Sequence, residues 1–394
     1  MKWKRAKISE VCQGIYDGPH ATPSVSEEGA VFLGISNITP DGHLDLSSPK
    51  YIGEKDLPKW TKRVTPQEGD IVFSYEATLN LYAIIPKGFR GCLGRRMALI
   101  RPDEEKVLGK FLYYYFFSDE WRGMIAENTV IGATVDRIPL IRFPNFPVSF
   151  PPVEKQRLIM SVLSAYDDLI ENNQKQIKLL EEAAQRLYKE WFVDLRFPGH
   201  ENTKITDGIP EGWKIQTLSQ IADVVMGQSP KSEFYNQNRQ GLPFHQGVGS
   251  YGTRFVVDKI YSTSFTRIAE AGSILFSVRA PVGRLNLTRN RVVIGRGLAA
   301  INHRLGKQSY LFYLLKEHFF KDDVIGNGAI FASISKDELL AQQFTIPVSN
   351  LIEQFNVIVS DMDGRIAELA EQVTLLIEAR DRLLPKLMSG EIEV

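Results

Sequence analysis

Side chains that could carry out catalysis do not cluster in the sequence of this 394-residue chain. Gly306-Lys307 has no glycine five residues earlier, so the sequence lacks the phosphate-binding loop of nucleotide hydrolases. It also lacks an Asn-Pro-Pro-Tyr or Asp-Pro-Pro-Tyr tetrapeptide that could hold a base flipped out of a duplex. Gly295-Arg296-Gly297 alone is a weak signal for dinucleotide binding. No group of carboxylates with a lysine suggests a nuclease, so we expect a binding protein rather than an enzyme.

Several glycine-containing loops instead carry side chains that can bind nucleic acid. Arginine pairs with guanine edges and glutamine with adenine edges, while lysine and serine contact phosphates. The candidates are Lys231, Gln246, Arg279, Arg284 and Arg296 in the second half, and Tyr16, His20, Tyr75, Arg95, Arg96 and Arg137 in the first half. Any one of them could instead be a solvated loop charge. The glycine–arginine pairs at 94–95 and 295–296 could mark only a turn.

Charge is distributed unevenly, although Lys+Arg and Asp+Glu both number 47. Residues 213–345 hold 16 basic and 9 acidic side chains, an excess of seven positive charges, whereas residues 1–151 hold 19 and 18. Residues 152–212 and 346–394 together hold 12 basic and 20 acidic side chains. A basic block beside acidic segments suits a module that binds a polyanion, although an ordinary surface could show the same balance.

Two cysteines, Cys12 and Cys92, and six scattered histidines form neither a disulfide framework nor a zinc-binding pattern. We therefore expect a metal-free cytoplasmic protein. The basic start, residues 1–5, is followed by polar residues that interrupt the apolar core of a signal peptide. No apolar run approaches 18 residues, so no membrane span is expected.

Two stretches are predicted to form long helices that pair as a coiled coil. Residues 153–192 contain neither Gly nor Pro, and a helix over 152–192 would be about 60 Å long, which requires a partner. Residues 347–394 repeat the apolar spacing. The predicted seam positions are Ile159, Val162, Tyr166, Leu169, Asn173, Ile177, Leu180 and Leu187 in the first helix, and Ile352, Phe355, Val359, Met362, Ile366, Leu369, Val373 and Leu376 in the second. An extra step of four at Asn173 interrupts the repeat; its amide could pin the register or turn toward solvent.

The helices alternate with two blocks of similar sequence. The matches, first block first, are 3–4 with 213–214, 69–74 with 272–277, 94–98 with 295–299, 111–114 with 310–313, and Gly132-Ala133 with Gly328-Ala329. An internal repeat on this scale indicates two copies of one structural unit. We predict an α+β fold with similar mixed α/β domains at 1–151 and 213–346, a helix at 152–192, a linker at 193–212, and a helix with a tail at 347–394.

Within the first block, residues 30–35 and 70–74 are predicted strands, because β-branched and aromatic residues lie between Gly, Pro and Asn. Residues 110–122 are a predicted helix that contains the aromatic run from Tyr113 to Phe117. Core packing is the simpler explanation of that run, and a platform for stacking bases is the alternative.

Five segments together resemble the specificity subunits of type I restriction-modification systems over essentially the whole chain. They are Phe150-Pro151-Pro152-Val153-Glu154-Lys155-Gln156, Asp167-Asp168, the run from Leu187 to Asp194, Ile209-Pro210-Glu211-Gly212-Trp213, and the run from Leu383 to Ile392. The second helix keeps only part of the Pro-Pro-x-x-Glu-Gln entry, in residues 347–354.

The resemblance implies two target-recognition domains, each reading half of a bipartite DNA site, and an antiparallel coiled coil that sets the half-site spacing. It also implies two modification (methyltransferase) subunits that carry S-adenosylmethionine, and restriction subunits that use ATP and Mg. No cofactor would bind this chain.

Three alternatives stay open. They are the recognition subunit of a type IIB-like system, an interaction protein that scaffolds other partners, and a self-contained adenine methyltransferase.

Overall fold

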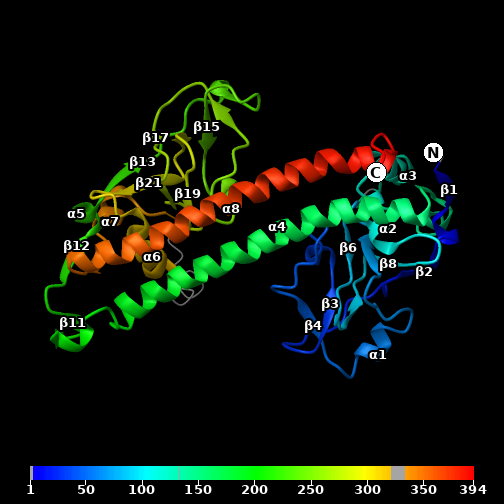
Figure 1. Cartoon of the computed structure of the whole chain (residues 1–394), viewed down its shortest axis with the longest axis horizontal. Helices are drawn as coiled ribbons and strands as arrows, with labels where there is room; N and C mark the ends of the chain where they lie inside the picture. Colours follow the sequence, from blue (N-terminus) through cyan, green and yellow to red (C-terminus); the bar gives the residue numbers. More distant parts are fainter. Residues whose placement is uncertain (1–2, 133, 321–332) are drawn as a thin grey trace. The chain divides into compact units, whose positions relative to one another are not determined.

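The computed structural model describes residues 3–132, 134–320 and 333–394. The chain divides into two compact units: unit 1 comprises Met1–Asn172 and Gln372–Val394, and unit 2 comprises Asn173–Glu371. Each unit therefore contains one block together with part of each long helix. The long helices are α4 (Val153–Tyr188), which continues as a short π-helical turn to Val193, and α8 (Ser349–Ser389). Figure 1 labels many of the helices and strands, among them α4 and α8.

Unit 1 begins with a four-stranded antiparallel sheet in the order β2-β8-β5-β6, next to a three-stranded sheet β4-β3-β7 in which β3 and β7 run parallel. A separate ladder joins β1 to β9. The strands are β1 (Lys4–Lys7), β2 (Cys12–Asp17), β3 (Ala30–Leu33), β4 (Lys50–Ile52), β5 (Ile71–Ser74), β6 (Tyr82–Ile84), β7 (Gly91–Leu93), β8 (Met97–Pro102) and β9 (Pro147–Phe150), and the short helices are α1 (Leu57–Trp60), α2 (Gly109–Tyr115) and α3 (Asp119–Asn128).

Unit 2 repeats this topology and adds one strand at each edge of the second sheet. Its four-stranded sheet has the order β13-β21-β18-β19, its second sheet has the order β14-β16-β15-β20-β17 with β15 parallel to β20, and β12 pairs with β22. The strands are β10 (Ile205–Thr206), β11 (Ile209–Pro210), β12 (Lys214–Thr217), β13 (Ala222–Met226), β14 (Tyr235–Asn236), β15 (Leu242–His245), β16 (Tyr261–Ser262), β17 (Ile268–Ala269), β18 (Ile274–Ser277), β19 (Leu285–Leu287), β20 (Val292–Ile294), β21 (Leu298–His303) and β22 (Gln343–Ile346), and the helices are α5 (Leu218–Ile221), α6 (Gln308–Phe320) and α7 (Lys336–Leu340). The matching order supports the predicted repeat. The proposed match of Gly328-Ala329 to Gly132-Ala133 lies partly outside the described residues.

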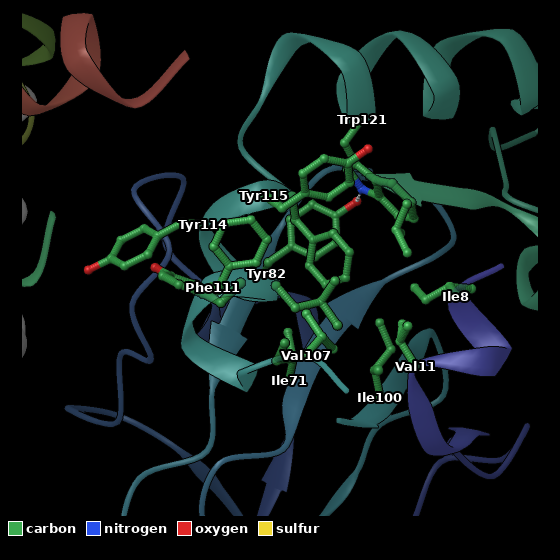
Figure 2. Packing of buried hydrophobic residues seen from close by; sticks show 14 of the residues in the cluster. Ile8, Val11, Ile71, Tyr82, Ile100, Val107, Phe111, Tyr114, Tyr115 and Trp121 are labelled. Carbon is green, nitrogen blue, oxygen red and sulfur yellow. Dashed lines mark hydrogen bonds between the residues drawn. The ribbon is translucent and has the colours of Figure 1, made fainter. Parts of the chain in front are cut away.

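The largest core of unit 1 forms where α2 and α3 cover the four-stranded sheet (Figure 2). Trp121 is fully buried and donates its ring N–H to the hydroxyl of Tyr82 at 2.8 Å. The residues from Tyr113 to Phe116 are buried in this core, which confirms core packing for most of the aromatic run. The predicted single helix at 110–122 is wrong, because Ser118 caps a new helix by accepting a hydrogen bond from the Trp121 backbone N–H.

The start of α4 is held by a buried glutamine of the Pro-Pro-x-x-x-Gln segment. Gln156 donates its side-chain amide to the Pro151 carbonyl at 2.9 Å and accepts the Leu108 backbone N–H at 2.9 Å. One side chain thus satisfies polar groups at the starts of both α4 and α2, which would otherwise be buried without partners.

Within unit 1, the beginning of α4 packs against the end of α8: Ile159 and Leu163 share a core with Leu384 and Leu387. Within unit 2, Ile177 packs against Ile366 and Leu369. The helix segments run antiparallel in unit 1, since Asp167 of α4 pairs with Arg380 of α8 while the earlier Ile159 lies beside the later Leu387.

The predicted seam positions of α8 are all buried or half-buried. The predicted seam of α4 is wrong at Leu169, which is 50% exposed, and Val162 is only half-buried. The buried positions are Leu163 and Ile170, so steps of three and four alternate through Asn173 without the extra step. Residues 162 and 163 are both apolar, and so are residues 169 and 170. The sequence was therefore equally compatible with either residue of each pair facing the partner helix. Asn173 is 6% exposed, so of the two alternatives the structure excludes the one in which its amide turns toward solvent.

No helix in the described part of the chain is both long enough and apolar enough to cross a bilayer.

Candidate nucleic-acid interface

In unit 2, three loops converge beside the turn between β20 and β21. The Ser229 hydroxyl donates to Gln246 Oε1 at 2.8 Å and accepts the Arg296 backbone N–H at 3.2 Å. The Gly297 N–H donates to the Gln246 carbonyl at 3.1 Å. The side chains of Gln246 and Arg296 are both exposed. The structure therefore brings together two of the predicted residues and holds their backbone by hydrogen bonds.

The Gly-Arg-Gly segment is a structural turn as well as a possible contact. A Cβ atom on Gly297 would lie 2.4 Å from the Gln246 carbonyl oxygen, and one on Gly295 would lie 2.7 Å from Gln246 Oε1. The backbone approach at Gly297 requires glycine, whereas the exposed amide of Gln246 could move away from a Cβ at position 295. Nothing requires arginine at position 296 for packing, because it is exposed.

The other basic candidates of unit 2 lie on neighbouring loops. Arg279 pairs with Ser333 through an isolated β-bridge, and the Arg284 N–H donates to the Ser277 hydroxyl at 2.8 Å. Both side chains are exposed. Lys231 is also exposed, and its ammonium is 3.9 Å from a Glu233 carboxylate oxygen. An exposed pair at that distance contributes little, so Lys231 can exchange it for a phosphate.

Unit 1 has the same turn between β7 and β8, where Arg95 is exposed and Arg96 is half-buried. Tyr75 holds this turn by two hydrogen bonds. Its hydroxyl donates to the Arg95 carbonyl at 3.1 Å, and its backbone N–H donates to the Arg96 carbonyl at 3.2 Å. The side chain of Tyr75 is 6% exposed, and burial raises its pKa. Its burial favours a role in positioning the turn over direct contact with a base.

Arg137 lies beside the same turn, opposite Glu76 in an isolated β-bridge. Glu76 is also 3.7 Å from Arg96. Tyr75 and Val278 occupy equivalent positions, because the backbone N–H of each donates to the glycine turn of its unit. The residue that follows is Glu76 in unit 1 and Arg279 in unit 2. Unit 1 thus carries a carboxylate where unit 2 carries a guanidinium, which lowers the positive charge of its loops.

Tyr16 and His20 lie at the end of β2. Tyr16 is half-buried against the second core of unit 1, whereas His20 is exposed and lies 3.0 Å from Asp17. Arg63 pairs with the same carboxylate. Sequence reasoning missed Arg63, because no local pattern links it to a strand end more than forty residues earlier.

None of these positions suggests bond-breaking chemistry. Within residues 3–132, 134–320 and 333–394 no group of three His, Cys, Asp or Glu side chains could hold a metal ion. Burial raises the pKa of both thiols, Cys12 and Cys92, to about 12, so neither is activated as a nucleophile. The assignment of individual residues to DNA contact stays a prediction.

Two units with one topology, each presenting basic side chains on equivalent glycine turns, define a protein with two related recognition surfaces. The model of the type I restriction modification DNA specificity domain matches residues 2–182 and 210–379. The chain belongs to this family. The predictions of a type I specificity subunit and of an α+β fold with two repeated domains are therefore confirmed.

Curated relatives agree over nearly full length. The chain is 28% identical to a protein named as the specificity subunit of the type I restriction enzyme MjaX from Methanocaldococcus jannaschii, over 100% of this chain and 94% of that protein. It is 26% identical to the MjaIX specificity subunit of the same organism, over 91% and 86%. The crystal structure of a type I S subunit from M. genitalium covers 98% of this chain and 96% of its own, at 17% identity and a TM-score of 0.59, and shares the fold.

Proposed function

We propose that each unit reads one half of a bipartite double-stranded DNA site, and that this chain supplies specificity without catalysis. The observation that carries the proposal is the duplicated turn that exposes Arg95 in unit 1 and Arg296 in unit 2 from equivalent strand connections. Arginine at such a turn can reach a guanine edge, and the neighbouring amide of Gln246 can read adenine. Two such surfaces in one chain suit an asymmetric, two-part target.

The catalytic partners would be two modification subunits that dock on the helices and recognition domains. They would bring S-adenosylmethionine and transfer its methyl group to adenine, while restriction subunits would add ATP- and Mg-dependent cleavage. Membership of the family supports these partners. The type IIB-like alternative is not favoured, because the curated relatives named above are type I specificity subunits.

The test of DNA recognition is the salt dependence of binding by the chain assembled with modification subunits. The logarithm of the binding constant falls as the logarithm of the salt concentration rises, and each lost phosphate contact makes this negative slope shallower by about 0.9. Changing the unit 2 set to Gln should flatten the slope more than changing the unit 1 set. The unit 2 set is Lys231, Arg279, Arg284 and Arg296, and the unit 1 set is Arg95, Arg96 and Arg137.

Arg186→Gln is the matched control, because Arg186 is an exposed arginine of α4 whose nearest acidic partner, Glu182, lies 3.8 Å away. Its slope should equal that of the unaltered chain. Equal slopes for the two sets would refute the dominance of unit 2. If the unaltered chain, assembled with modification subunits, shows no salt-sensitive binding to DNA, the result would instead favour an interaction protein.

Two further measurements separate the enzyme classes. The chain alone, incubated with labelled S-adenosylmethionine and duplex DNA, should transfer no label; transfer would identify a self-contained methyltransferase. Mapping methylated adenines in DNA modified by the full complex should give a single bipartite sequence.

A further inference from the structure

A cavity of about 440 Å³ opens in unit 1 where α2 faces the last part of α8. Its aromatic walls are Tyr113, Tyr114 and Phe117. Arg380 also lines it, held by Asp167 at 2.8 Å and by its neighbour Asp381 at 2.9 Å. A space of this size has room for a long side chain with its flanking backbone.

Unit 2 has the same arrangement of aromatic side chains and carboxylate. The Tyr114 hydroxyl donates to Asp167 in unit 1, and the Tyr313 hydroxyl lies 3.4 Å from Asp363 in unit 2. The sequence match of 111–114 with 310–313 places Phe312 at the position of Tyr113. The two sites are therefore copies of one structural position.

In unit 2 a guanidinium from the chain itself fills that position. Arg254, from the loop after β15, lies with its guanidinium carbon 4.1 Å from the Phe312 ring centroid. It pairs with Asp363 and lies 3.5 Å from Glu181. Arg254 is 4% exposed; burial alone would lower its pKa, but Asp363, Tyr313 and Glu181 raise it. The aromatic position is thus built to hold a desolvated guanidinium.

In unit 1 the equivalent carboxylate, Asp167, is paired with Arg380 of α8, but this guanidinium does not stack on the equivalent rings. Within the part of the chain that the structure describes, no cation lies over the ring of Tyr113 or Tyr114, and Arg122 lies only over Phe117, 5.9 Å from its centroid. The loop that faces Tyr113 contacts it through a backbone carbonyl, because the Tyr113 hydroxyl donates to the Gly42 carbonyl at 2.9 Å. No arginine of this loop can enter the cavity in the way that Arg254 does.

The site in unit 1 also carries more negative charge than the site in unit 2. In unit 2, Arg254 and Lys316 balance Glu181 and Asp363. The cavity of unit 1 is lined by two arginines and four aspartates, so it lacks two positive charges; these residues are Arg122, Arg380, Asp41, Asp119, Asp167 and Asp381. Among the described residues, Asp41 and Asp119 have neither an ion pair nor a hydrogen bond through the side chain, and both are exposed.

We propose that the cavity of unit 1 receives an arginine side chain from a modification subunit, against the ring of Tyr113 as Arg254 lies against Phe312 in unit 2. This inference rests on the proposed function for the identity of the partner. The guanidinium would lie against Tyr113 and Phe117, with Asp41 and Asp119 supplying the negative charge. Guanidinium groups combine stacking on rings with paired hydrogen bonds to carboxylates, which an ammonium does less well.

The first test uses the chain without any partner. N-acetyl-L-arginine amide is titrated into the full chain by ligand-observed NMR, with N-acetyl-L-citrulline amide as the neutral analogue of equal shape. The arginine probe should bind and the citrulline probe should bind at least fivefold more weakly. Absence of binding, or equal binding of both probes, overturns the proposal.

Variants locate the binding. Asp41→Asn with Asp119→Asn should weaken binding of the arginine probe at least fivefold, because both unpaired carboxylates become neutral. Asp337→Asn is the matched control: like Asp119 it is an exposed aspartate in the first turn of a short helix, and it does not line the cavity. Equal weakening by the control, or none by the double variant, contradicts the assignment.

The second test measures the affinity of a modification subunit for the same variants. The double variant should assemble at least tenfold more weakly than the unaltered chain, while Asp337→Asn assembles normally. Normal assembly of the double variant overturns the inference. Failure of the unaltered chain to assemble, with the arginine probe still bound, would refute the proposed function and the identity of the partner together.

Discussion

Replacing Arg254 by methionine should destabilise unit 2 strongly. Arg254 contacts groups from both long helices and from α6: Asp363, Glu181 at 3.5 Å, and the Tyr313 hydroxyl at 3.3 Å. Methionine keeps much of the side-chain volume but leaves two carboxylates in a poorly solvated site without their cation. Breaking a buried pair by removing one partner costs about 3–5 kcal/mol.

The pairs are only partly enclosed, since Glu181 and Asp363 keep some exposure. We therefore expect about 3 kcal/mol, at the lower end of that range. For a unit of this size 1 kcal/mol shifts the melting temperature by about 2–4 °C, so the transition of unit 2 should fall by roughly 6–12 °C. Differential scanning calorimetry of the full chain measures that transition, and urea unfolding gives the free energy.

The cause is tested by a double variant. If the unpaired carboxylates are responsible, Arg254→Met with Asp363→Leu should recover part of the lost stability, because Asp363 no longer leaves a buried charge without a partner while Glu181 still lacks Arg254. Arg291→Met is the control, since its pair with Glu270 is exposed and should contribute less than about 1 kcal/mol. A loss below 1 kcal/mol for Arg254→Met, or no recovery in the double variant, would refute this account.

Three more predictions follow from the helices and one half-buried histidine. Asn173→Leu should raise the melting temperature, because the amide lies on the apolar seam; a less stable variant with unchanged assembly would exclude a pinning role. Four residues inserted near Gln176 lengthen α4 by about 6 Å, so methylation mapping should show a spacer longer by one or two base pairs, each about 3.4 Å. Four residues inserted in the linker 193–212 should leave the spacer unchanged, and the reverse result would refute a role of α4 in spacing. Burial and Lys307 lower the pKa of His303, whose Nδ1 accepts the Leu305 N–H at 3.0 Å. The unfolded chain then binds the extra proton first, so stability should fall as pH drops below about 6.5 toward the lowered pKa; melts from pH 7.5 to 5.5 should show a smaller fall in His303→Gln.

Interpreting the sequence alone identified the large elements of this protein. The helices α4 and α8 were predictable because neither Gly nor Pro interrupts residues 153–192 and because apolar residues recur every three or four positions in both stretches. The duplication was predictable because matched segments occur in the same order in both blocks, and the sheet orders agree with it. Segments shared with the family identified the class of protein.

The register of α4 was decided only by packing. Val162 and Leu163 are both apolar, as are Leu169 and Ile170, so the sequence allows either residue of each pair to face the partner helix. Contact of Leu163 with Leu384 and Leu387 in one core selects the second residue of the pair. A pattern read along one helix cannot show which apolar face meets a partner distant in sequence.

For the loop residues, too, the sequence and the tertiary structure each determined a different part. The sequence showed which arginines lie beside glycines, but not that Tyr75 is buried beneath the turn, nor that Asp17 joins Arg63 to His20. Arg254 gave no local signal, because Glu181 and Asp363 are 73 and 109 residues away. Composition and periodicity are local properties that determined the elements and their repetition. Burial and ion pairing depend on segments that meet only after folding, so the tertiary structure alone decided which charges are exposed and which are enclosed.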